Sequence, residues 1–193
     1  MNKLIFTLSL IFSLNSFAQE NKYEPVANKA EYYAVKYLPG KNYMDFRNWV
    51  MENQENVLNK TDVYDNFDIA LFQPQFGTDL TQFDAVFLGL WPNATEMFAG
   101  MEYWAKNGGE QNAKVPVKTV QAVDTWQWAV SAPEGDPDIG VVRFSDCKMK
   151  DGVNANQVFD ALKDFAIAAR ETGDTLGRKM IFPGSGGTVG DYD

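Results

Sequence analysis

Residues 83–91 read FDAVFLGLW, and the expected fold follows from this stretch. Alternate residues of a strand point to opposite sides, so a strand over 83–91 would be apolar on both faces. Strands that are apolar on both faces are typical of the interior of a sheet. We therefore place residues 83–91 in the centre of a sheet and assign the neighbouring elements outward from it.

A helix and a further strand are predicted after this stretch. Asn93 and Glu96 have the spacing of a capping box, in which groups at a helix start satisfy one another's hydrogen bonds. A helix over 94–106 is therefore expected, and the Asn-Gly-Gly sequence at 107–109 ends it. Residues 120–130 are predicted to form the next strand.

A strand, a helix and another strand are predicted before the stretch. Residues 31–38 are rich in Tyr and Val, which favour strands. Asn42 is a typical helix cap, and apolar residues recur at helical spacing over 43–58. Residues 67–73 are the second predicted strand.

Residues 31–131 thus follow the order β-α-β-β-α-β, which predicts an α+β fold of the ferredoxin-like type. In that arrangement the sheet is antiparallel and both helices lie on one face. The other face needs a cover, and a fused repeat or a partner subunit usually provides it.

The pattern restarts after a Pro- and Gly-containing linker at 131–138. Residues 139–149 are predicted to be a strand, residues 155–171 a helix and residues 178–182 a strand. This β-α-β order makes residues 139–193 an incomplete second ferredoxin-like unit.

The second unit stops where the first continues. Tyr192-Asp193 at the end of the chain aligns with Phe83-Asp84, which opens the central strand of the first unit. We expect the sequence to be a truncated form of a longer two-repeat protein. The alternative is a natural product of this length with a disordered tail.

This element order resembles that of the dimeric α/β-barrel superfamily, in which two ferredoxin-like units, fused or from two chains, pack sheet to sheet. The resemblance extends over about residues 31–190 and rests on element order alone. It implies a possible homo-oligomer, and the superfamily includes haem-degrading and antibiotic-biosynthesis monooxygenases. Haem binding in that group commonly uses histidine, which this chain lacks, so no cofactor is expected.

The N-terminus has the layout of a secretory signal peptide over residues 1–18. Lys3 provides the positive start, an apolar run follows, and Ser16-Phe17-Ala18 supplies small residues for a cleavage site. Cleavage after Ala18 would give an exported protein, periplasmic or extracellular, with a flexible lead-in over 19–30.

Composition excludes several classes of function. The chain has 193 residues, a net charge of −9 and no histidine. It therefore has no Ser-His-Asp or Cys-His nucleophile and no histidine-ligated metal. Its cations form no stripe, which argues against nucleic acid as a partner, and its acidity argues against a membrane surface after signal cleavage. No metal site is expected.

Cys147 is the only cysteine, so no intramolecular disulfide can form. It lies in the predicted strand over 139–149, and we expect it to be buried and inert.

Aromatic residues at strand positions form the candidate ligand site. Spacing by two places Trp126 with Trp128 on one strand face, and the same alternation places Phe87 with Trp91. An arginine on a sheet face can hold a carboxylate through two hydrogen bonds. The candidate ligand-binding residues are Phe72, Phe87, Trp91, Trp126, Trp128 and Arg143. The alternative is that the same aromatic residues form an ordinary core between sheets.

Three functions remain open from the sequence. The first is an exported protein that binds a small apolar or aromatic molecule, or a protein partner, without catalysis. The second is a histidine-independent enzyme of the barrel-monooxygenase type. The third is a structural domain whose open sheet face associates with another copy.

Overall fold

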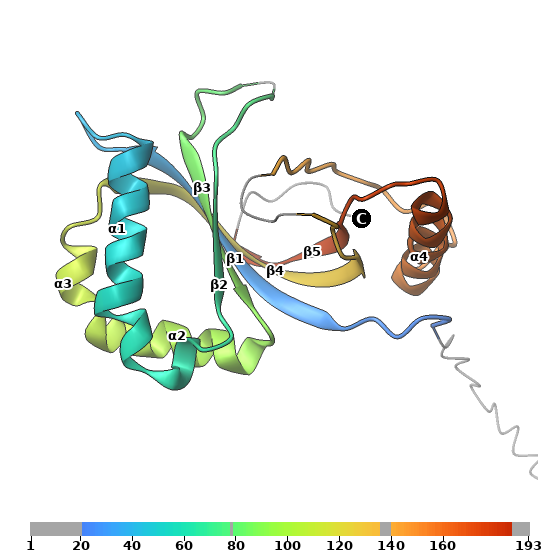
Figure 1. Cartoon of the computed structure of the whole chain (residues 1–193), viewed down its shortest axis with the longest axis horizontal. Coiled ribbons are helices and arrows are strands. Elements are labelled where there is room, and N and C mark those ends of the chain that lie inside the picture. Colours follow the sequence, from blue (N-terminus) through green and yellow to red (C-terminus); the bar gives the residue numbers. More distant parts are fainter. Residues whose placement is uncertain (1–20, 78, 136–139, 187–193) are drawn as a thin grey trace, which may run out of the picture.

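The computed structural model describes residues 21–77, 79–135 and 140–186. These residues form an α+β structure with one five-stranded antiparallel sheet and four helices (Figure 1). The strands are β1 (Ala27–Tyr37), β2 (Asp68–Phe72), β3 (Ala85–Trp91), β4 (Val117–Ser131) and β5 (Arg178–Gly186). The helices are α1 (Tyr43–Asn56), α2 (Ala94–Asn107), α3 (Gly109–Asn112) and α4 (Ala155–Glu171), with short 3-10 turns η1 (Leu58–Lys60) and η2 (Asp62–Tyr64).

The sheet has the strand order β2-β3-β1-β4-β5, and all neighbouring strands are antiparallel. β3 contains the apolar stretch from which the prediction began, and it lies between β1 and β2, which confirms its interior position. β1 begins at Ala27 rather than Glu31, so it includes the end of the predicted lead-in. The predicted β-α-β-β-α-β order is found over 27–131.

Asparagine caps start the three long helices where the sequence predicts them. The side chains of Asn42, Asn93 and Asn154 each accept a hydrogen bond from the backbone N–H three residues further along the chain, at 3.3, 3.0 and 3.0 Å. The first N–H groups of a helix have no partner within the helix, so a side-chain oxygen at this position stabilises its start. None of the helices among the described residues is long and apolar enough to cross a membrane.

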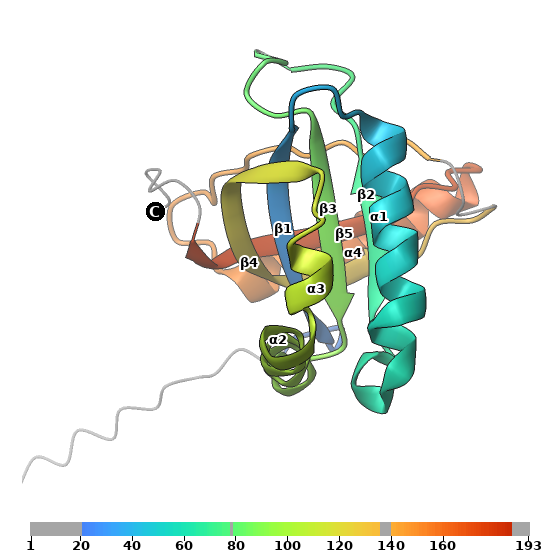
Figure 2. The same ribbon diagram turned by 90° about the vertical axis from the view of Figure 1, so that its left-hand side faces the viewer.

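Two apolar clusters attach the helices to the sheet. Phe46 and Val50 of α1 pack with Val35 of β1, and Phe159 of α4 packs with Val130 of β4. Figures 1 and 2 show α1, α2 and α3 together over one part of the sheet, with α4 apart from them beside β5. The candidate site lies between the sheet and the first group of helices.

The predicted strand over 139–149 is wrong. Residues 140–150 form an irregular segment whose side chains are exposed, although the Phe144 ring makes edge contacts with Tyr32 and Phe72. The edge of β4 that such a strand needs is occupied by β5. Residues such as Val141 and Phe144 favour strands, but strand propensity depends on an available partner.

The expectation that Cys147 is buried in this strand is also wrong. No strand forms here, and Cys147 is exposed. Among the described residues, the second half of the chain supplies α4 and β5, and β5 joins the same sheet as β1–β4 instead of starting a second sheet. The predicted signal peptide over 1–18 and the chain end at Tyr192-Asp193 lie outside the described residues.

Candidate functional site

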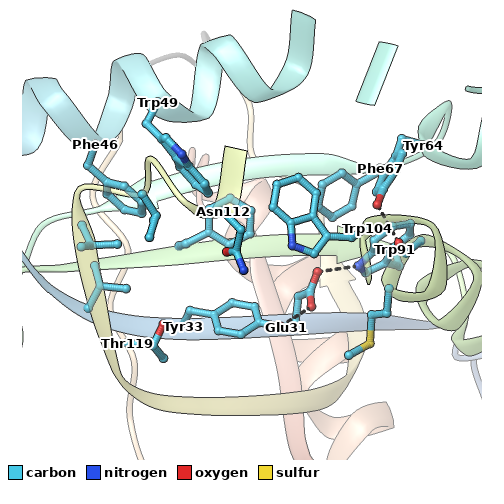
Figure 3. A pocket seen from close by; sticks show the side chains of 16 residues that line it. Glu31, Tyr33, Phe46, Trp49, Tyr64, Phe67, Trp91, Trp104, Asn112 and Thr119 are labelled. Atoms are coloured by element: carbon cyan, nitrogen blue, oxygen red, sulfur yellow. Dashed lines mark hydrogen bonds between the residues drawn. The ribbon is translucent and has the colours of Figure 1, made fainter. Parts of the chain in front are cut away.

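An aromatic cavity of about 310 Å³ lies between the sheet and helices α1 and α2 (Figure 3). Eight aromatic side chains line it, together with one carboxylate, Glu31. The aromatic residues are Tyr33, Phe46, Trp49, Tyr64, Phe67, Phe87, Trp91 and Trp104. Three further lining residues, Met101, Asn112 and Thr119, are exposed and form its rim. The cavity is therefore open to solvent on one side and apolar inside.

Strand alternation explains how the sheet supplies its share of the wall. Glu31 and Tyr33 are two residues apart on β1 and so point to the same face. On β3, Gly89 lies opposite Glu31 and Phe87 lies opposite Tyr33, which puts all four on the face that the helices cover. The rings of Tyr33 and Phe87 meet edge to face, with centroids 6.1 Å apart.

Two glycines make room for the larger side chains. A Cβ atom on Gly89 would lie 2.7 Å from the Phe67 ring and 2.8 Å from the Glu31 carboxylate. A Cβ atom on Gly100 of α2 would overlap the Trp91 ring. Carbon atoms in contact normally lie at about 3.5–4.0 Å, so only glycine allows the helix and the strand to approach these side chains so closely.

The Glu31 carboxylate accepts two hydrogen bonds from uncharged donors. The Tyr33 hydroxyl donates to Oε2 at 2.8 Å, and the Trp91 indole N–H donates to Oε1 at 3.1 Å (Figure 3). Burial raises the pKa of Glu31 above its ordinary value, and the two hydrogen bonds, which favour the charged form, only partly oppose the shift. The largest cause of the raised pKa is therefore the burial of the carboxylate in apolar surroundings.

The neighbouring tyrosines stay protonated at neutral pH. Burial first, and the nearby Glu31 charge second, raise the pKa of Tyr33. The same two causes raise the pKa of Tyr64 to about 12. The Tyr64 hydroxyl donates to the backbone carbonyl of Gly100 at 2.6 Å, which ties η2 to α2 at the edge of the cavity. Both phenols act here as neutral hydrogen-bond donors.

The cavity lining has one carboxylate and otherwise mainly apolar and aromatic side chains. Within residues 21–77, 79–135 and 140–186, no group of three or more Cys, Asp or Glu side chains is arranged to hold a metal ion. The cavity offers apolar walls and one oriented acceptor group, the combination that small-molecule pockets typically have.

The structure separates the six residues of the predicted ligand site. Only Phe87 and Trp91 line the cavity. Trp126 is 37% exposed on β4, and Trp128 packs against Phe182 with ring centroids 5.4 Å apart.

Phe72 contacts Phe144 on the opposite face of the sheet. Phe72 pairs with Val86, and Val86 points away from the face that its neighbour Phe87 shares with the cavity. Arg143 is exposed in the irregular segment over 140–150. The expected position of Arg143 on a sheet face depended on the strand that does not form.

The sequence analysis missed Glu31 and the helix aromatics Trp49 and Trp104. A signal for Glu31 is present, because a charged residue in the middle of a Tyr-, Ala- and Val-rich strand needs a buried partner or a function. Trp49 lies within the helix predicted over 43–58, and the structure shows that its indole N–H donates to the Gln111 carbonyl at 2.9 Å at the cavity wall.

The raised pKa of Glu31 predicts how stability depends on pH. The folded chain holds this proton more tightly than the unfolded chain, so its stabilising effect is complete below the ordinary pKa and is lost as the pH rises through the folded pKa. The amide in Glu31→Gln does not titrate, so this variant does not lose stability in this way as the pH rises. We expect the stability of Glu31→Gln relative to the wild type to increase from about pH 4 to about pH 8, measured by urea unfolding.

Glu171→Gln removes an exposed carboxylate from α4 and controls for the change in net charge. A stability difference between Glu31→Gln and the wild type that stays constant with pH would show that Glu31 is as well solvated in the folded chain as in the unfolded chain.

Comparisons of the chain with protein-family models, with curated proteins and with solved structures found no match.

Proposed function

We propose that this protein binds a small apolar or aromatic molecule in the aromatic cavity between its sheet and helices α1 and α2. The observation that carries the proposal is a cavity of about 310 Å³ lined by eight aromatic side chains. Small-molecule sites typically measure roughly 300–1,000 Å³ and combine apolar walls with a few polar groups. Compact aromatic molecules, from a single substituted ring to a molecule of two or three rings, fit this size.

The packing around the cavity supports a preformed site. Trp91 is 2% exposed, and its ring lies 4.1 Å from that of Phe67 and 5.4 Å from that of Tyr64, measured between centroids. These contacts hold the inner wall in place without a ligand. The exposed rim residues Met101 and Thr119 leave a path for a ligand from solvent.

The proposal includes a ferredoxin-like unit over 27–131 as the scaffold. Its support is the β-α-β-β-α-β order together with the strand order β2-β3-β1-β4 and antiparallel neighbours throughout. Export through the signal-peptide pattern over 1–18 is likewise proposed from the sequence. An exported binding protein of this kind would meet its ligand outside the cytoplasm.

A rim-blocking substitution tests the proposed function. Thr119→Trp places an indole at the opening of the cavity. The probe is N-phenyl-1-naphthylamine, a neutral aromatic molecule whose fluorescence rises in apolar surroundings. We expect the wild type to bind the probe. We expect Thr119→Trp to bind it at least about tenfold more weakly, a loss of about 1.4 kcal/mol or more.

Lys118→Trp is the matched control. Lys118 is exposed and neighbours Thr119 on β4, so its side chain points to the other face of the strand. It introduces the same indole away from the cavity and should leave probe binding at the wild-type level. Absence of probe binding to the wild type, or equal binding by both variants, would contradict the proposed function.

A further inference from the structure

We propose that the ligand of the aromatic cavity is an organic cation, with its charge beside the Glu31 carboxylate and its apolar body against the surrounding rings. This inference rests on the proposed function and specifies the chemical class of the ligand. It follows from the charge balance of the cavity, which contains one acid and no base among its lining residues.

Glu31 lacks a cationic partner in the described part of the chain. Its two hydrogen bonds come from the uncharged donors Tyr33 and Trp91, one to each oxygen. A carboxylate has about four acceptor positions on its two oxygens, so each oxygen keeps capacity for a further donor. Buried carboxylates are normally paired with a cation or a metal. A cationic ligand would supply the missing charge.

The nearest lysine on the same strand is already engaged. Lys29 lies two residues from Glu31 on β1 and faces the same way, but its ammonium group pairs with Asp124. It also lies 4.6 Å from the centroid of the Trp126 ring. Lys29 is 3% exposed, so this arrangement is fixed by packing. Asp124 thus neutralises the charge of Lys29, which is not paired with Glu31.

The aromatic walls add a second attraction for a cation. The faces of Trp, Tyr and Phe rings carry negative charge density and attract cations within about 6 Å. Lys29 over Trp126 shows this contact inside the protein itself. The cavity presents rings from five elements, β1, α1, η2, β3 and α2, around one carboxylate. An anionic ligand would meet the Glu31 charge with no lining Lys or Arg to offset it.

The charge of the whole chain favours the same class of ligand. The net charge is −9, so the chain attracts cations and repels anions in solution. Salt weakens this long-range effect, whereas the contact with Glu31 inside the cavity is less exposed to screening.

A pair of probes with the same shape and different charge tests the inference. Phenyltrimethylammonium is a permanent cation, and tert-butylbenzene is its uncharged isostere. Both are measured by displacement of N-phenyl-1-naphthylamine from the wild type. We expect the cation to bind about tenfold more tightly than the isostere. In Glu31→Gln we expect most of this preference to disappear, leaving the smaller part that the ring faces contribute, whereas Glu171→Gln should keep the wild-type ratio.

A second measurement uses only the wild type and stands even if Glu31→Gln fails to fold. The preference for the cation should fall as the pH is lowered through the folded pKa of Glu31, since neither probe titrates. The other titratable groups facing Glu31 are Tyr33 and Tyr64, which stay protonated, and the pair Lys29 with Asp124. Burial opposes ionisation of Asp124, but hydrogen bonds from Lys29 and Ser185 outweigh it and lower its pKa, so Glu31 titrates first.

The outcomes separate the inference from the proposed function. If both probes displace the fluorescent molecule equally well from the wild type, the cation inference is overturned and binding in the cavity stands. A cation preference that survives undiminished in Glu31→Gln and at low pH also overturns it. If no probe binds to the folded wild type, the proposed function fails and the inference fails with it.

Discussion

Trp91→Ala is expected to destabilise the protein by about 3–5 kcal/mol, the range found when a buried tryptophan is truncated. Trp91 is 2% exposed and packs its ring against Phe67, with centroids 4.1 Å apart. Its indole N–H also donates one of the two hydrogen bonds to Glu31. The substitution therefore enlarges the cavity and leaves a half-buried carboxylate with one donor. Urea unfolding followed by circular dichroism measures the loss.

Trp126→Ala provides the matched control on the same sheet. Trp126 is 37% exposed, lies outside the cavity and contacts Lys29 through its ring face. Its removal should cost about 2 kcal/mol, the size of a cation–π contact to a desolvated cation. A loss for Trp91→Ala as small as that for Trp126→Ala would mean that the wall of the cavity is not preformed, and it would weaken the argument for a site that exists without its ligand.

The features that the sequence predicts correctly are those with local causes. Asn42, Asn93 and Asn154 start helices because their side chains bond to backbone groups within one turn. The interior position of β3 follows from apolar residues on both of its faces. Such signals need no information about the rest of the chain, which is why the element order over 27–131 was predictable.

The features that the sequence does not predict depend on contacts between distant residues. The segment over 140–150 has strand-favouring residues, but β5 occupies the sheet edge that it would need. The cavity exists because Gly100 of α2 lets Trp91 of β3 approach the helix backbone, and a lone glycine in a helix does not reveal its neighbour. Glu31 gains its setting from the indole of Trp91, sixty residues further along the chain.

For the same reason, only some of the predicted ligand-binding residues lie at the cavity. Strand alternation places Phe87 and Trp91 on one face correctly, and both line the cavity. The alternation also pairs Trp126 with Trp128, yet Trp128 packs with the cluster around Phe159 of α4. The period of a strand fixes the face of each residue, but the helix that covers each part of the face is decided by the chain as a whole.

Asp124→Ala is the second substitution with a large expected effect, a loss of about 3 kcal/mol, because it leaves the buried Lys29 ammonium without its partner. The second oxygen of Asp124 accepts a hydrogen bond from the Ser185 hydroxyl at 2.6 Å, so the substitution also removes a contact that holds β5 to β4. A Cβ atom on Gly184 would overlap the Asp124 carboxylate, which shows how closely β5 fits against it.

The double variant Lys29→Met with Asp124→Leu separates charge from packing. It removes both charges and keeps apolar side chains of similar size, and such replacements of buried ion pairs are often neutral or stabilising. We expect it to recover most of the stability that Asp124→Ala loses, while hydrogen exchange of the β5 amides, residues 178–186, stays faster than in the wild type because the Ser185 contact is still absent. If the double variant is as unstable as Asp124→Ala, the loss comes from the shape of the β4–β5 junction, and the Lys29 charge is not the cause.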